Sequence, residues 1–371
     1  MIEPAVADAI DLNRVRRVLV IKLRHHGDVL LTSPVFTALS RAMPHAETDA
    51  LVYLETAPML QSHPAIARVH AIDRGLKKRG PLAQAAGELA LWRSLRRRRY
   101  DLVVHLTDHP RGAWLARLVG ARYAVAPERA REGWLWRRCF THRYLLPLST
   151  PRHTVEQNLD ALRRIGIWPD DADKPLVFVP GPDAQARADA LLAAHGIERR
   201  RFILVHPGSR WMFKCWPAQP TAALLDRLAE SGWRVVLTGA PDPAEAKLVA
   251  AIKASMRSTP VDLSGQLTLL ELGALIGAAR LFIGCDTAPM HMACAAGTPV
   301  VAWFGPSGEA EWGPWRVPHR VVASDAHPCR PCGNNGCGGS NNSDCLITLP
   351  LARVDAAVTA LLAETGAPTP Q

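Results

Sequence analysis

Short apolar runs alternate with segments of helical periodicity along this chain, and that alternation limits the folds open to it. Nine runs are expected to be strands, at 18–21, 48–54, 68–72, 101–106, 122–126, 201–205, 234–238, 280–283 and 299–304, the last of them being the final strand. Helical patterns lie between them, for example at 81–98 and 110–119. Strands that alternate with helices predict an α/β fold with parallel, doubly wound sheets.

The length of 371 residues is enough for two domains, at about 100–200 residues each. Residues 169–175 combine acids and prolines without apolar periodicity, so we expect an interdomain linker there. The expected domains are 1–174 and 175–371. The linker contains Asp171-Ala-Asp173, a tripeptide of the kind that binds a metal–diphosphate in some glycosyltransferases, but its surroundings do not favour a metal site.

The basic excess is confined to the first half. Residues 1–175 contain 28 Lys and Arg against 18 Asp and Glu, whereas 176–371 contain 16 of each, so the net charge of +10 belongs to the first half. This indicates an anionic partner, which leaves open a nucleic acid, an acidic membrane or a phosphorylated glycolipid. The alternative is a solvated basic face without a partner.

No secretory or membrane-spanning segment is expected. No run reaches the roughly 18–20 apolar residues that span a bilayer. Residues 1–13 carry three acids and no cationic region, which is unlike a signal peptide. We therefore expect a cytosolic protein.

The stretch Lys22–Pro34 follows the first strand and is the first candidate site. Ligands of open α/β sheets bind at the carboxyl ends of the strands, where this loop places Arg24, His25, His26 and Asp28. Asp28 precedes a helical pattern, so it is either an N-cap or a chemically active group, and the two are compatible.

Two arginine-rich stretches in this half allow two interpretations each. Residues 131–140 interleave cations with large aromatics, which suits a sugar, a lipid headgroup or a membrane interface, but also a buried aromatic helix. Residues 96–99 are four consecutive arginines. They would bind phosphate or simply complement the C-terminal end of a helix dipole.

Two loops of the second half have the composition of a phosphate site. Gly208 and Ser209 offer a bendable backbone, and Lys214 offers a cation. Asp286-Thr287-Ala288 opens a helix whose unpaired amides attract anions. Together they predict a nucleotide-diphosphate site without a metal. Glu245 is placed either to accept a hydrogen bond from a ribose hydroxyl or to be solvated.

Four of the eight cysteines, Cys329, Cys332, Cys337 and Cys345, lie within 17 residues. Four thiolates suit a structural zinc, although the spacing is not that of a standard finger or ribbon. A disulfide is disfavoured in a reducing cytosol, and a loop of free thiols remains open.

Three motifs in this order resemble the bacterial lipopolysaccharide heptosyltransferases over nearly the whole chain. They are Gly27-Asp-Val-Leu-Leu-Thr-Ser-Pro34, His206-Pro-Gly-Ser-Arg with Lys214 and Trp216-Pro217, and Phe282-Ile-Gly-Cys-Asp-Thr-Ala-Pro-Met-His-Met followed by Gly297 to Ser307. Within the family, Arg24-His-His and the cysteine-rich loop at 329–345 look most like heptosyltransferase III.

The resemblance implies a GT-B fold, with two Rossmann-like domains facing across a central cleft, and an inverting, metal-independent enzyme without a cofactor. The first domain would bind the acceptor, and the second would bind ADP-heptose. Asp28 would be the general base. The donor would contact Ser209, Lys214, Glu245, Asp286, Thr287, Ala288 and His291. The acceptor would contact Arg24, His25, His26, Arg131, Trp134 and Arg137.

The implied reaction transfers L-glycero-D-manno-heptose from ADP-heptose to a heptose hydroxyl of the phosphorylated lipopolysaccharide inner core. The enzyme would be cytoplasmic and peripherally associated with the inner face of the plasma membrane. Alternatives are heptosyltransferase I or II, or a GT-B sugar-nucleotide epimerase or hydrolase. A nucleic-acid partner is not expected, because the chain offers no aromatic stacking platform beyond Trp134, Trp136 and Phe140.

Overall fold

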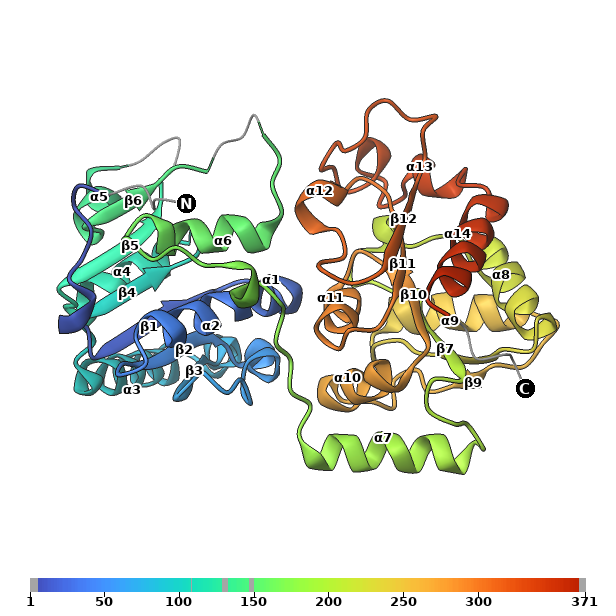
Figure 1. Cartoon of the computed structure of the whole chain (residues 1–371), viewed down its shortest axis with the longest axis horizontal. Helices are drawn as coiled ribbons and strands as arrows, with labels where there is room; N and C mark the ends of the chain where they lie inside the picture. The colour runs from blue at the N-terminus through green and yellow to red at the C-terminus, as the bar shows by residue number, and fades with distance from the viewer. Residues whose placement is uncertain (1–5, 108, 129–132, 147–149, 367–371) are drawn as a thin grey trace. The chain divides into compact units, whose positions relative to one another are not determined.

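The computed structural model describes residues 6–107, 109–128, 133–146 and 150–366. The chain divides into two compact units, which we call unit 1 (Met1–Val179) and unit 2 (Pro180–Gln371). In Figure 1 unit 1 runs from blue to green, and unit 2 runs from green to red. The boundary falls slightly later than the 174/175 expected from the sequence.

Unit 1 is built on one six-stranded parallel sheet of order β3-β2-β1-β4-β5-β6 (Figure 1). The strands are β1 (Arg17–Ile21), β2 (Glu47–Tyr53), β3 (Arg68–Ile72), β4 (Leu102–His105), β5 (Tyr123–Pro127) and β6 (His142–Tyr144). Val18 to Ile21 are fully buried, as expected of a central strand covered on both faces.

Helices cover both faces of this sheet. The helices of unit 1 are α1 (His26–Leu30), α2 (Ser33–Ala42), α3 (Pro81–Arg98), α4 (Pro110–Val119), α5 (Trp134–Cys139) and α6 (Thr154–Arg163). Short 3-10 helices are η1 (Leu12–Arg14), η2 (Leu54–Met59), η3 (Arg74–Arg79) and η4 (Asp171–Asp173). Helix α2 packs on α6, while α3, α4 and α5 pack in series.

Unit 2 repeats the arrangement with a parallel sheet of order β12-β11-β10-β7-β8-β9. Its strands are β7 (Phe202–His206), β8 (Arg234–Leu237), β9 (Val261–Asp262), β10 (Leu281–Cys285), β11 (Val300–Phe304) and β12 (His319–Ala323). Read from β9 back to β12, the order is that of unit 1. The prediction of doubly wound parallel sheets is therefore confirmed.

The helices of unit 2 complete the same pattern. They are α7 (Pro182–Ala194), α8 (Ala218–Glu230), α9 (Pro243–Ser255), α10 (Leu269–Ala278), α11 (Ala288–Ala295), α12 (Glu309–Trp312), α13 (Asp344–Ile347) and α14 (Leu351–Glu364), with the 3-10 helices η5 (Met212–Lys214) and η6 (Cys337–Gly339). Figure 1 shows α7 beside α10, against which it packs.

In each unit the strand order reverses direction at one point. These points lie between β1 and β4 and between β7 and β10. Loops that leave neighbouring strands at such a point diverge to opposite faces of the sheet and leave a crevice for a ligand. All three candidate loops of the sequence leave strands at these two points.

The segment 169–175 is not a linker, and this expectation was wrong. Asp170 and Asp173 accept hydrogen bonds from the Arg41 guanidinium of α2, at 2.7 and 2.8 Å. Asp173 is buried and also closes the capping box of η4. The acids of this segment therefore fasten it to unit 1, and Asp173 has a structural partner in place of a metal.

The arginine run at 96–99 is at least partly structural. Arg98 donates to both carboxylate oxygens of the buried Asp49, at 2.8 and 3.1 Å. Arg99 ends α3 in the left-handed region, at φ 52°. Of the two interpretations, a structural role is correct for Arg98, because its guanidinium neutralises a buried carboxylate in β2.

No helix within the described residues has the length and apolar character needed to cross a membrane.

Candidate active site

Lys22 braces the loop that carries Asp28. Its ammonium is buried and donates to the Leu106 carbonyl at 2.9 Å and to Asn158 Oδ1 at 3.1 Å. Asn158 of α6 in turn donates to the Leu31 carbonyl at 3.0 Å, just after α1. The ends of β1 and β4 are thereby tied together, and the following helix is held in place.

Asp28 is the third residue of α1, and the N-cap is His25. The hypothesis that Asp28 caps this helix was therefore wrong, although its charge still lies in the first turn, where the dipole favours an anion. Its nearest cation is Arg24, whose Nε lies 3.9 Å from Oδ1. No hydrogen bond to the carboxylate occurs within the described residues, which leaves its oxygens available to a ligand.

The other three candidate residues of the Asp28 loop, Arg24, His25 and His26, differ in their contacts and exposure. His25 adopts an extended backbone and makes no side-chain cap. His26 Nε2 donates to the Glu55 carbonyl of η2 at 2.8 Å, so it holds the loop against that helix. The Arg24 side chain is largely exposed. Of the three, Arg24 is best placed to meet a large polar ligand.

The aromatic residues of 131–140 were expected to be either exposed for a ligand or buried in a helix, and the structure contains both arrangements. Trp136 and Phe140 are buried, with ring centroids 4.9 Å apart, and Phe140 stacks on His105. Trp134 is exposed and lies under the Arg138 guanidinium, 4.9 Å from its ring centroid. Arg137 is exposed as well, and Arg131 lies outside the described residues.

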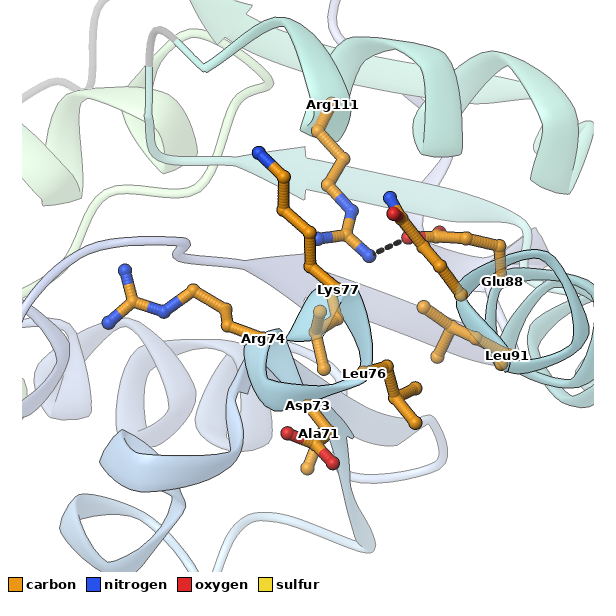
Figure 2. A pocket seen from close by; sticks show the side chains of 11 residues that line it. Ala71, Asp73, Arg74, Leu76, Lys77, Glu88, Leu91 and Arg111 are labelled. Atoms are coloured by element: carbon orange, nitrogen blue, oxygen red, sulfur yellow. Dashed lines mark hydrogen bonds and ion pairs between the residues drawn. The ribbon is translucent and has the colours of Figure 1, made fainter. Parts of the chain in front are cut away.

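A pocket of about 260 Å³ opens among η3, α3 and α4 in unit 1. Figure 2 shows Lys77 and Arg111 reaching into it from η3 and α4, with Glu88 and Leu91 of α3 across from them. Arg111 forms an ion pair with Glu88. The wall is thus partly apolar and partly cationic.

A second hollow adjoins this pocket and is lined by Glu55, Arg74 and Lys78, among others. Arg74 lines both and forms an ion pair with Glu55. No hydrogen bond or ion pair engages Lys77 or Lys78 in the described part of the chain. Two unneutralised ammonium groups therefore remain at this edge of the sheet.

Sequence reasoning missed these cations. The signal was the run Lys77-Lys78-Arg79, which begins five residues after the strand at 68–72, at the sheet edge where ligands bind. Glu55 links the hollow to the candidate loop, because its carbonyl binds His26 and its carboxylate binds Arg74.

In unit 2 the two predicted loops meet at the switch point. Lys214 Nζ lies 2.5 Å from Asp286 Oδ2 and 3.4 Å from the Asp286 carbonyl. The Cys285 thiol donates to the Gly208 carbonyl at 3.3 Å. The hydrogen bond with the neighbouring Cys215 thiol, together with burial, raises the pKa of Cys285, so it keeps its proton. Asp286 is buried, and its role here is to hold Lys214 in place.

Helix α11 begins beside this ion pair and offers two unpaired donors. Thr287 is the N-cap and makes no side-chain cap; its hydroxyl donates weakly to the Cys285 carbonyl at 3.4 Å. The amides of Thr287 and Ala288 have no partner within the described residues, whereas that of Met290 bonds to the Thr287 carbonyl. Two amides and one ammonium form a site for an anion.

The remaining donor-side candidates are buried. Ser209 Oγ accepts from the Trp211 amide at 3.0 Å and shapes the loop, and His291 lies within α11. Glu245 Oε2 accepts from the Ala240 amide at 2.9 Å, so Glu245 is not the solvated residue of the alternative. A Cβ at position 208 would overlap Glu245 Oε2, which explains the glycine there.

His206 lies below this loop and does not supply a positive charge. Its Nδ1 lies 3.0 Å from Thr238 Oγ1, and its Nε2 lies 3.6 Å from Glu245 Oε2. Burial lowers the pKa of His206 to about 4, so the ring is neutral at pH 7. Burial raises the pKa of Glu245. The cation of the site is therefore Lys214.

The cysteine-rich loop holds free thiols. Cys329, Cys332 and Cys337 are exposed, and Cys345 is buried in α13. No cluster of three or more metal-binding side chains that could hold an ion is present among the described residues. The loop is fastened to the fold by Ser343, whose hydroxyl donates to the Phe213 carbonyl at 2.7 Å.

Comparison with known proteins gives one family. The family model described as glycosyltransferase family 9 (heptosyltransferase) matches residues 88–341. The chain is 37% identical over 295 residues to lipopolysaccharide heptosyltransferase 3 of Escherichia coli, an alignment that covers 79% of this chain and 84% of that protein.

Solved structures share the fold at lower identity. The glycosyl transferase family 9 protein from Veillonella parvula matches with a TM-score of 0.82 and 23% identity, over 96% of this chain and 100% of that one. The Escherichia coli ADP-heptose lps heptosyltransferase II matches with a TM-score of 0.74 and 21% identity, over 95% and 100%.

Proposed function

The chain belongs to glycosyltransferase family 9, the heptosyltransferases, and we propose that it transfers L-glycero-D-manno-heptose from ADP-heptose to a heptose hydroxyl of the lipopolysaccharide inner core. A lipopolysaccharide heptosyltransferase 3 is among its relatives, and this supports a heptosyltransferase III-like acceptor. The cysteine-rich loop and Arg24-His25-His26 support the same subtype.

The anion site of unit 2 carries this proposal. A diphosphate leaving group develops negative charge as the glycosidic bond breaks, and preorganised donors lower the barrier to that step. Lys214 and the amides of Thr287 and Ala288 supply such donors at the β7–β10 switch point. ADP would bind here, with Glu245 near the ribose and Ser209 and His291 lining the pocket.

This arrangement supports a metal-independent reaction. Asp286 is engaged by Lys214, so the positive charge for the phosphates comes from the lysine and the helix terminus. In the proposed mechanism Lys214 and the α11 amides do the work of a bound cation, and no cofactor takes part.

Asp28 is the proposed general base. Its carboxylate is close to one exposed arginine and accepts no hydrogen bond within the described residues. It would take the proton of the acceptor hydroxyl as that oxygen attacks the anomeric carbon and ADP leaves. A single displacement from the face opposite the leaving group inverts the configuration. Positioned proton transfer contributes about 10²–10⁴-fold to the rate.

The cations of unit 1 would meet the acceptor. Lys77 and Lys78 are unneutralised, and Arg74 and Arg111 line the same pockets. Phosphoryl groups of an inner-core glycolipid are suitable ligands for such a cluster. Arg24, Trp134 and Arg137 would extend the acceptor contact. The enzyme would act on the cytoplasmic side of the inner membrane as a peripheral protein.

A direct test incubates the full chain with ADP-heptose and a purified core oligosaccharide that lacks the side-branch heptose. We expect mass spectrometry to record a gain of one heptose on that acceptor and release of ADP. Fragmentation would identify the branch position and hence the subtype. Turnover of ADP-heptose without acceptor would instead indicate an epimerase or hydrolase, and no turnover with any inner-core acceptor would contradict the proposal.

A further inference from the structure

Large exposed apolar side chains gather on one layer of helices in unit 1. On α3, Leu82 is 86% exposed and Leu89 is 42% exposed. On α4, Trp114 is 49% exposed and Leu118 is 47% exposed, and on α5, Trp134 is 68% exposed. Scattered exposed apolar residues are ordinary, but a contiguous set marks an interaction surface.

The exposed side chains lie on three helices that pack in series, α3 against α4 and α4 against α5. Leu82 and Leu89 are two turns apart on α3, and Trp114 and Leu118 are one turn apart on α4. Trp92 joins the two helices, because its Nε1 donates to the Leu118 carbonyl at 3.3 Å. Helix α4 also packs beside α5, the helix that presents Trp134. We call this layer of three helices the α3–α5 face.

Helix α3 is unusual for a globular protein. Of its 18 residues only Leu95 is buried. A surface helix normally directs an apolar stripe to the core and leaves the opposite side polar. Here Leu82 and Leu89 lie on the solvent side, so their apolar area is not used by the fold itself.

The part of the chain that forms the α3–α5 face is also strongly basic. Residues 81–140 contain 12 arginines against five Asp and Glu, which is +7 of the total net charge of +10. Arg96 lies over the Trp92 ring at 5.9 Å, and Arg138 lies over the Trp134 ring at 4.9 Å. Tryptophan next to a cation is typical of the headgroup region of a bilayer, where the apolar part of the ring is buried and its N–H remains hydrated.

The orientation of this face agrees with access to a lipid-borne acceptor. Helices that follow parallel strands begin at the carboxyl edge of the sheet, so Leu82 and Trp134 in the first turns of α3 and α5 lie towards that edge. Asp28 follows β1 at the same edge. Arg111, which lines the cationic pocket, lies one turn before Trp114 on α4.

We propose that the α3–α5 face docks on the surface of an anionic lipid bilayer. Trp114 and the leucines would enter the interfacial region, and Arg93, Arg97 and Arg117 would pair with lipid phosphates. The inference rests on the proposed function, because it deepens the peripheral membrane association proposed there. It assigns that association to one face, beside the acceptor pocket.

Vesicle sedimentation of the full chain tests this. We expect binding to vesicles of phosphatidylglycerol and phosphatidylcholine, and little binding to phosphatidylcholine alone. The variant L82S/W114S should lower the partition coefficient by about tenfold or more, because two exposed apolar side chains lose their interfacial contact. The variant R93Q/R97Q/R117Q should lower it by about a hundredfold, at about fivefold per cation.

Matched controls lie in unit 2. I347S removes an exposed apolar residue of α13, and R187Q/K247Q removes two exposed cations of α7 and α9. Neither control should change vesicle binding by more than about twofold. Wild-type failure to bind anionic vesicles, or equal losses in test and control variants, would overturn the proposal.

Two further readouts separate the alternatives. If the face were instead a contact between two copies of this chain, L82S/W114S would convert a dimer to a monomer in light scattering and leave vesicle binding intact, which would contradict docking. Transfer to a soluble core oligosaccharide needs no bilayer. Retained transfer by L82S/W114S would therefore leave the proposed function standing whatever the vesicle result.

Discussion

The switch points of the two units share a strand order but differ in how their side chains are held. At β7–β10 most candidate residues are buried, and the loops are bonded to one another, as in the Lys214–Asp286 pair and the Cys285–Gly208 contact. In unit 1 the Lys22 side chain at β1–β4 is buried, but Arg24 in the same loop and the cations of η3, which follows the edge strand β3, face solvent. The same topology thus frames a preorganised site in one unit and an open one in the other.

The two units also differ in charge. Unit 1 carries the entire net charge of +10, and unit 2 is neutral. A preorganised site lowers the ordering cost of binding a small ligand such as a nucleotide-sugar. A glycolipid is large and anionic, so long-range attraction and an open edge serve it better. The shared strand order therefore determines where a ligand site lies in each unit, whereas the burial and charge of the side chains determine which kind of ligand that site suits.

The largest expected effect falls on the open site. We predict that Asp28→Asn lowers kcat by about 10²–10⁴-fold, because the amide retains the shape of the side chain but cannot take a proton. Titration calorimetry with ADP-heptose should give an unchanged Kd. If ADP-heptose affinity fell by as much as kcat, Asp28 would have a structural role. Unit 1 would then not supply the catalytic base, and the proposed division of roles between the two units would be wrong.

The ion pair of unit 2 allows a double-mutant test. Lys214→Ala should lower kcat/KM for ADP-heptose by about 10²–10³-fold, because it removes the cation at the leaving group. It should also destabilise the protein by about 3–5 kcal/mol, because Asp286 remains buried without its partner.

The second variant separates those two effects. Lys214→Ala/Asp286→Asn should recover most of the lost stability in thermal unfolding, since no uncompensated charge stays buried, but it should recover no activity. Recovery of both would indicate that the pair only holds the loop.

The smallest effect is expected at the cationic pocket. Lys77→Gln/Lys78→Gln should raise KM for a phosphorylated acceptor by about three- to tenfold, consistent with exposed charges in high dielectric. The change should shrink with added salt and be absent for the dephosphorylated acceptor. The control R187Q/K247Q should alter neither KM. Similar changes for both acceptors would argue against a phosphate contact.

Most of the fold could be predicted because its signals are local. Buried central strands such as β1 and β11 are continuous apolar runs, and the helices between them keep their periodicity. The strands that were missed lie at sheet edges. β6 has three residues, β9 has two, and β12 begins with His319 and Arg320 and is half exposed, so none gives an apolar run.

Other features depend on partners far away in the sequence. Asp173 belongs to unit 1 because Arg41, 132 residues earlier, binds it. Local composition could indicate only a linker there. The two loops with the composition of a phosphate site could be recognised from the glycine, serine and lysine residues that follow strands. Their contact through Lys214 and Asp286 could not be predicted, because it depends on the order of the strands in the sheet. The pocket of Lys77 and Arg111 could not be predicted locally, because it depends on the packing of α3 against both η3 and α4.

The hydrogen bonds of Lys22 affect when the loop that carries Asp28 can form during synthesis of the chain. The second hydrogen bond of the Lys22 ammonium cannot form until Asn158, 136 residues downstream, has been synthesised. Chains fold from the N-terminus as they leave the ribosome, domain by domain. The loop that bears Asp28 is therefore completed only when α6 has emerged, at nearly the full length of unit 1. In unit 2 the Lys214–Asp286 pair spans only 72 residues, so both partners have been synthesised before the last strands and α14.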